Sequence, residues 1–151
     1  MKVLNIQKEL LVDLMTDASA VCVKEMAGDR WLIIKPNKTQ GFVLKADDLR
    51  LHIRGTQADF SFNWVKYEDY VGNPRLEIKP TGTYKAYGKG LVQEFTDELG
   101  ARCIYVNTEY LKHFEGAQFY TEHGDSVIAV AETTPGGAQE LVGIVMPVNM
   151  K

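Results

Sequence analysis

The sequence predicts an α+β fold: one domain with antiparallel sheets, helices packed on one side of them, and an internal βαβββ duplication. Residues 3–14 and residues 103–114 share one pattern, an apolar stretch, a polar break, and apolar residues at helical spacing. Runs of alternating apolar and polar residues follow each copy, which is typical of strands. At 151 residues the chain has the length of a single domain. We therefore predict one domain over residues 1–151 with two similar halves, at about 1–65 and 101–150.

In the first half, apolar residues recur on one face of a helix over residues 6–15. These residues are Ile6, Leu10, Leu11, Leu14 and Met15. Strands are then predicted over five short segments separated by glycine, proline and asparagine turns. The segments are 21–24, 31–34, 41–44, 49–54 and 60–64.

The two halves are joined by a crossover over residues 66–100. Its first part, 66–90, holds glycines, prolines and four tyrosines among basic residues, and it is predicted to be an irregular loop. A helix is predicted from about Gly90, ending at Gly100 as its C-cap. Its inward residues would be Leu91, Val92, Phe95 and Leu99.

In the second half, the residues that begin and end each helix and strand are easier to identify. A strand is predicted over 102–106, followed by a helix that Asn107 or Thr108 caps and that runs to Phe114, with Gly116 stopping it. Three further strands are predicted over 117–122, 126–132 and 140–145. The sequence therefore places a strand, a helix and three strands in this half.

Composition limits the classes of function. The net charge is −3 and the isoelectric point near 5.6, so the chain lacks the basic character of a dedicated nucleic-acid binder. The charge is uneven, with a basic excess in residues 1–93 and an acidic excess in 94–151. No apolar run approaches the roughly 20 residues that span a bilayer, so no membrane association is predicted. The chain has no leader-like start, and we expect a cytoplasmic protein with Cys22 and Cys103 as buried thiols.

Two segments resemble a known family. The family is the DNA sliding clamp of the bacterial polymerase III beta-clamp type, and the resemblance is to its last domain. The strand and the start of the helix in that domain are similar to residues 106–111. Its closing strand is similar to residues 140–150. The resemblance covers residues 101–150 and implies a clamp-like domain that is not an enzyme. It also implies an apolar groove for a protein partner with a short apolar motif, in DNA replication or repair of a bacterial or mobile-element system. Carried over by position, the groove residues are Met146, Pro147, Val148 and Met150. The alternative is that Val145, Met146 and Val148 are ordinary core of a terminal strand.

The chain also departs from that family. It has the length of one domain where the clamp has three, so a ring would require a homo-oligomer of six copies. Asn149 stands where the family usually has arginine. The predicted helices carry more acid than base, with Glu9 and Asp13 against Lys8 in the first helix. Acidic helices repel phosphate, so DNA is a partner that the charges do not favour.

Two alternatives from other classes stay open. The first is single-stranded nucleic-acid binding by the crossover, because tyrosines can stack on bases while lysines hold phosphates. The residues concerned are Tyr67, Lys79, Tyr84, Lys85, Tyr87 and Lys89. The second is a small enzyme with an unrecognised site, although no catalytic residues or cofactor motif can be named. His113, Glu122, His123 and Asp125 have the right types for a metal, but their spacing matches no ligand motif, so no metal is predicted.

Overall fold

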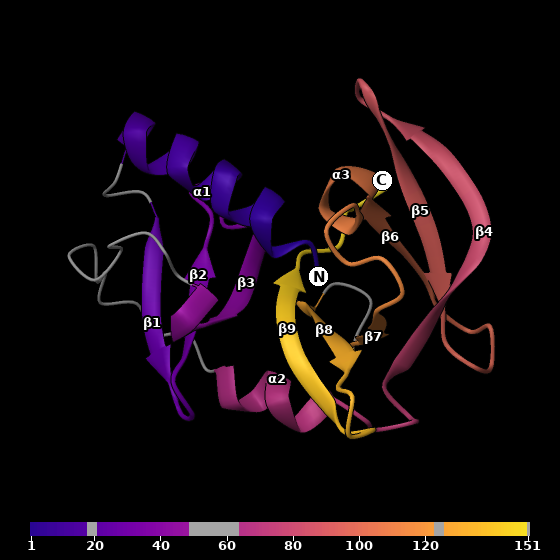
Figure 1. The fold of residues 1–151 in the computed structure, drawn as a ribbon. Coiled ribbons are helices and arrows are strands. Elements are labelled where there is room, and N and C mark those ends of the chain that lie inside the picture. Colours follow the sequence, from indigo (N-terminus) through magenta and orange to yellow (C-terminus); the bar gives the residue numbers. More distant parts are fainter. Residues whose placement is uncertain (18–20, 49–63, 123–125, 151) are drawn as a thin grey trace.

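The computed structural model describes residues 1–17, 21–48, 64–122 and 126–150. Within these ranges the chain forms one nine-stranded antiparallel sheet with three α-helices and a short 3-10 helix (Figure 1). The strand order is β1-β2-β3-β9-β8-β7-β4-β5-β6. The elements are α1 (Val3–Asp17), β1 (Cys22–Met26), β2 (Arg30–Ile34), β3 (Gln40–Lys45), η2 (Ala46–Asp48), α2 (Trp64–Tyr70), β4 (Glu77–Tyr87), β5 (Gly90–Thr96), β6 (Cys103–Asn107), α3 (Thr108–Leu111), β7 (Gln118–Tyr120), β8 (Ile128–Thr133) and β9 (Gln139–Val145).

A helix followed by three antiparallel strands occurs twice. The chain runs α1-β1-β2-β3 in its first part and α3-β7-β8-β9 in its last part. The third strands of the two units, β3 and β9, are neighbours and stand third and fourth in the strand order. Beyond β7 the sheet continues into β4, β5 and β6, and the segment after β9 returns to β6 through a bridge between Val148 and Tyr105.

Apolar side chains cover both faces of the central strands. Along β2, Trp31 and Ile33 belong to one core, and Leu32 and Ile34 belong to a second core on the other face. A strand that is apolar on both faces needs cover on both. The first core includes Ile6 and Leu10 of α1 and Tyr110 and Leu111 of α3, and the second includes Tyr70 of α2. We call these two faces of the sheet the α1 face and the α2 face.

The prediction that helices pack on one side therefore holds for α1 and α3 but is wrong for α2. Figure 1 shows α1 and α2 on opposite sides of strands β1–β3. None of the helices in the described ranges is long and apolar enough to cross a membrane.

The buried face of α1 is narrower than predicted. Ile6 and Leu10 are fully buried, but Leu11 and Met15 are 43% and 80% exposed. The side chain of Leu14 lies outside the described part. At 100° per residue, Leu11 and Met15 are turned too far from the line of Ile6 and Leu10 to reach the sheet.

The crossover differs most from its prediction. Residues 66–90 are not an irregular loop, because α2 and the eleven-residue β4 occupy most of them. The helix predicted from Gly90 is wrong, since Gly90–Thr96 is β5 and pairs with β4 on one side and β6 on the other. Val92 and Phe95 are both buried, and their spacing of three residues imitates a helix. Hydrogen bonding to two neighbouring strands overrides that local signal.

The strands predicted at 21–24, 31–34, 41–44 and throughout the second half are confirmed to within two residues at their ends. The predicted strand 49–54 and most of 60–64 lie outside the described residues, and Trp64 begins α2. Asn107 is confirmed as the N-cap of α3, whose Glu109 amide donates to Asn107 Oδ1 over 2.9 Å.

Two expectations about the repeated segment are wrong. The helix α3 ends at Leu111, so Phe114 lies beyond it. In the first half α1 already begins at Val3, so no strand precedes it. The thiols also differ from expectation, because Cys22 is half-buried and Cys103 is exposed.

Candidate functional site: a split between β3 and β9

The ladder that joins the two halves of the sheet is short. Strand β3 pairs with β9 only at Gln40–Val145, Gly41–Ile144 and Phe42–Gly143. Both strands continue past this point without pairing to each other. In the same register Val43 would face Val142 and Lys45 would face Glu140, but the strands have separated there. The sheet is therefore split, and each side of the split is a strand edge.

A β-bulge explains why β9 leaves β3. Opposite β9, Val130 pairs with Gly143 but the next residue, Ala131, pairs with Leu141. Val142 is thus an extra residue in β9, and such a residue bends the strand and increases its twist. Because the bulge coincides with the end of the β3–β9 ladder, β9 follows β8 and turns away from β3.

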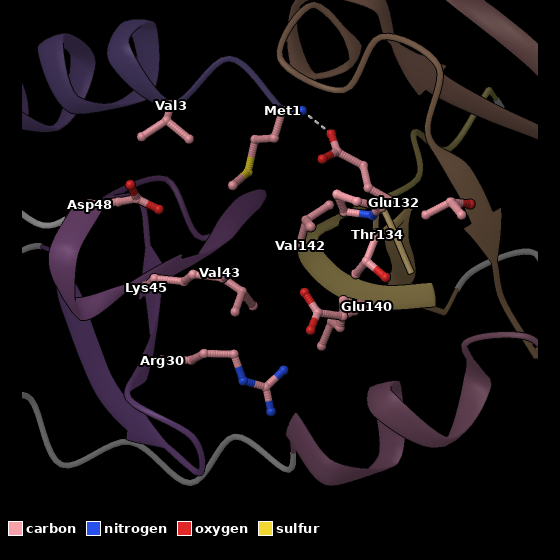
Figure 2. Close-up of a pocket in the computed structure, with 13 residues that line it drawn as sticks. Met1, Val3, Arg30, Val43, Lys45, Asp48, Glu132, Thr134, Glu140 and Val142 are labelled. Carbon is pink, nitrogen blue, oxygen red and sulfur yellow. Dashed lines mark hydrogen bonds and ion pairs between the residues drawn. The ribbon is translucent and has the colours of Figure 1, made fainter. Parts of the chain in front are cut away.

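The split encloses a cavity of about 240 Å³ (Figure 2). Its two walls are Val43 and Lys45 of β3 and residues 140–142 of β9. Met1 and Val3 border it on the side of α1, and the β8–β9 turn contributes Pro135. Figure 2 shows the labelled side chains around a common space, with those of β3 and those of β9 on opposite sides. The lining combines an apolar interior with charged groups.

The basic charges of the split lie on the α2 face. Arg30 and Lys45 are directly paired residues of β2 and β3, so their side chains share a face. Arg30 contacts Glu68 of α2 over 2.7 Å, which fixes that face as the α2 face. Within the described chain Lys45 has no ion-pair partner. Among the described residues, one basic group of the split is therefore neutralised and the other is unpaired.

The acidic charges lie on the α1 face. Glu132 and Glu140 are directly paired residues of β8 and β9. Glu132 forms an ion pair with the amino group of Met1, which packs against the α1 core. Asp48 lies beside α1, where its carbonyl accepts a hydrogen bond from Gln7. Glu140, like Lys45, has no ion-pair partner among the described residues.

A second cavity, of about 490 Å³, lies beside the end of α2. Its lining includes Val71, Pro74 and Tyr120, and the Tyr120 hydroxyl donates to Gln139 Oε1 over 2.6 Å. Neither cavity is lined by the C-terminal residues for which the sequence predicted a groove.

The structure places the predicted groove residues on the segment that follows β9. The Met146 amide donates to the Thr39 carbonyl over 2.8 Å, and the Val148 amide donates to the Tyr105 carbonyl over 2.7 Å. These bonds fasten the segment between β3 and β6. All four residues, Met146, Pro147, Val148 and Met150, are half-buried. Their role in binding a protein partner stays a prediction.

The six residues of the nucleic-acid prediction are dispersed. Five lie on or beside the β4–β5 hairpin, but Tyr67 lies on α2, packed edge-on against Tyr70. The lysines of β4 are close to acids, Lys79 to Glu77 over 3.9 Å and Lys85 to Glu94 over 3.8 Å. Successive side chains of a strand point to opposite faces, so Tyr84 and Lys85 are not neighbours on one surface.

An ion-pair cluster ties α1 to both halves of the sheet. Glu9 accepts from Lys35 Nζ over 3.0 Å and lies 3.2 Å from Lys112 Nζ. Buried His113 lies 3.0 Å from the same carboxylate through Nε2. Asp13 lies 3.4 Å from Lys35. The acidic residues that the sequence assigned to a phosphate-repelling helix are therefore engaged with lysines of the body.

This cluster shifts two pKa values downward. Partial burial would raise the pKa of Glu9, but the Lys35 hydrogen bond, the charge of His113 and the Lys112 hydrogen bond lower it from 4.5 to about 2. Burial lowers the pKa of His113 below its usual 6.5, against the opposing effect of Glu9. Both groups therefore bind protons less readily in the folded chain than in the unfolded chain.

We expect acid to destabilise the protein through this cluster. Stability should fall as pH drops below about 6.5 because of His113, and again between 4.5 and about 2 because of Glu9. Glu9→Gln should cost roughly 2 kcal/mol at pH 7, an amount reduced for partial exposure, and this cost should disappear toward pH 2. Urea unfolding across pH measures both effects. Glu109→Gln is the control, since its side chain is 71% exposed; an equal loss there would contradict the expectation.

Among the residues that the structure describes, no group of three or more histidine, cysteine, aspartate or glutamate side chains is placed to hold a metal ion. His123 and Asp125 lie outside the described part, and Glu122 accepts from Tyr70 over 2.7 Å. Searches against protein-family models, curated proteins and solved structures find no match to this chain.

One local feature of the sequence points to the split. Gly143 stands inside a strand pattern, and such a glycine often marks a bulge or a close backbone approach. Its consequence for Val43, Lys45 and Glu140 depends on how β3 meets β9, which lies about a hundred residues away in the chain.

Proposed function

We propose that the chain is a non-enzymatic interaction module that binds a short segment of a partner protein in the split between β3 and β9. One observation carries this proposal: two strand edges face each other across an apolar interior, beside one positive and one negative side chain, Lys45 and Glu140, that have no ion-pair partner among the described residues. Exposed strand edges are sites where another chain pairs. An edge lined by apolar residues adds favourable burial to that pairing.

The size of the split supports a peptide ligand over a cofactor. Sites for cofactors and small molecules commonly enclose about 300–1,000 Å³. The split encloses about 240 Å³, which suits a few side chains of a longer segment that continues past both ends.

The titrating groups also support binding over catalysis. A catalytic acid or base usually has a shifted pKa within the site where it acts. Among the described residues, the two groups with the largest pKa shifts, Glu9 and Lys66, lie outside the split. Each takes part in ion pairs that join structural elements, such as Lys66 of α2 with Glu122 after β7.

A clamp-like plan with an internal duplication belongs to the same proposal. It is supported by the two helix-plus-three-strand units, which meet through β3 and β9 with α1 and α3 on the same face. A role in DNA replication or repair of a bacterial or mobile-element system rests on the resemblance over residues 101–150. The partner class, a protein with a short apolar motif, agrees with the apolar lining of the split.

Panning a phage library of random dodecapeptides on the whole chain tests the proposal. Peptides that bind should lose at least tenfold in affinity on Val142→Asp, because a carboxylate would enter the apolar lining beside Glu140. The matched control is the Met146→Ala, Pro147→Ala double variant, which should keep binding. Unfolding curves establish that each variant is folded. The reverse result would place the site on the C-terminal segment, and peptides insensitive to both changes would reject the proposal.

A further inference from the structure

We infer that the bound segment is an extended strand that hydrogen-bonds to the free edge of β3, with basic side chains on the α1 face and acidic side chains on the α2 face. This inference rests on the proposed function and concerns the same split. It specifies the conformation of the ligand and the order of its charges.

The backbone of β3 has hydrogen-bonding groups that face the split. The Gln40 carbonyl accepts a hydrogen bond from the Lys35 amide, and the Ala46 amide donates one to the Asp29 carbonyl. The backbone groups at even-numbered positions of β3 therefore point toward β2. The Thr39 carbonyl accepts from Met146 beyond β9, so odd-numbered positions bond the other way. This alternation is that of an antiparallel strand.

Two of the odd-numbered positions, Val43 and Lys45, have no partner strand on this side among the residues that the structure describes. Thr39 and Gly41 pair with Met146 and with Ile144 of β9, respectively. Val43 and Lys45 do not pair with β9, because the β3–β9 ladder ends at Phe42. Backbone groups of this kind are strong donors and acceptors that a further strand would satisfy. The edge of β3 can therefore form backbone hydrogen bonds to a ligand strand at two residues, Val43 and Lys45.

A strand fits this space better than a helix. Neighbouring strands lie about 4.8 Å apart, whereas a helix with its side chains is about 10–12 Å wide. A helix would also leave the edge groups of Val43 and Lys45 without partners. The outer side of β4, which is the longest strand among the described residues, is a poorer template. It carries Pro80, which has no amide hydrogen, and a register shift between Pro80 and Tyr84.

The charges of the split give the ligand a pattern. Side chains of an inserted strand alternate between the α1 face and the α2 face. On the α1 face they meet Asp48 and Glu140, which favour a basic residue. On the α2 face they meet Lys45, which favours an acidic residue. The segment should therefore place a basic and an acidic side chain an odd number of residues apart.

Two synthetic octapeptides of identical composition test this pattern. Both contain valine and threonine with one lysine and one glutamate. In the first the lysine and glutamate are adjacent, so they point to opposite faces; in the second one residue separates them, so they share a face. By NMR titration we expect the first to bind at least tenfold more tightly. It should also slow amide exchange at Val43 and Lys45.

Charge-reversal variants of the protein test whether Lys45 contributes to peptide binding. Lys45→Glu should weaken binding of the first peptide about tenfold, while Lys89→Glu, on the exposed β4–β5 turn, should leave it unchanged. Equal binding of the two peptides, with loss of both on Val142→Asp, would overturn the strand register and keep the proposed function. No binding of either peptide would overturn the inference, and the phage selection decides the proposed function separately.

Discussion

Gly143→Ala should destabilise the protein by about 3 kcal/mol, at the upper range for overpacking a core. An alanine Cβ at this position would lie 2.5 Å from Phe114 Cζ and 2.8 Å from the Gly41 carbonyl oxygen. The Phe114 ring is buried and packs against Phe42 with ring centroids 5.7 Å apart, so it has little room to move. Moving Gly41 would break the ladder that joins β3 to β9.

Urea unfolding measures this loss, and Gly136→Ala is the control. Gly136 lies in the β8–β9 turn, where an added Cβ would meet only Thr134 Oγ1 at 3.9 Å. We expect the control to change stability by less than about 0.5 kcal/mol. If Gly143→Ala were equally mild, β3 and β9 would not approach closely at Gly143. The account of the split as two edges diverging from a tight junction would then fail.

The strands of the second half could be predicted because their signals are local. Alternating apolar residues and the turn residues around Pro135 limit where each strand begins and ends. The Asn107 cap was predictable for the same reason, since its bond to the Glu109 amide spans two residues. Local chemistry of this kind is contained in a few consecutive residues.

The crossover could not be predicted because its structure is fixed by distant partners. Val92 and Phe95 have helical spacing, yet β5 is a strand because β4 and β6 flank it. The second face of the sheet was missed for a related reason. Residues 31–34 are apolar throughout, which fits a strand covered on both faces, but nothing local identifies α2 as the cover.

The candidate site was the feature that could least be predicted from the sequence. Lys45 and Glu140 are ordinary exposed charges in the sequence. They face one split only because β9 bulges at Val142, where its pairing with β3 ends. The residues that attracted notice, such as Tyr84 and Lys85, were close in sequence but point to opposite faces of a strand. In a β-strand, residues that are adjacent in the sequence do not share a surface, so adjacency in the sequence predicts a binding surface poorly.

Phe42→Ala should cost about 3–5 kcal/mol, the largest effect that we expect from a single substitution. Phe42 is fully buried in β3 and meets two residues of the second half, His113 with ring centroids 5.5 Å apart and Phe114. Removing the ring would leave a cavity at the junction of the two helix-plus-three-strand units. A large loss there would show how strongly the two units depend on one core.

Phe95→Ala is the matched comparison, because Phe95 is equally buried but lies in β5 and packs on Phe119 with centroids 5.0 Å apart. Both phenylalanines belong to one continuous core, so the chain should unfold as a single domain. Each substitution should then lower one shared urea transition and speed amide exchange in both halves. If Phe42→Ala accelerated exchange only in β1–β3, the halves would be separate folding units and the core would not act as one.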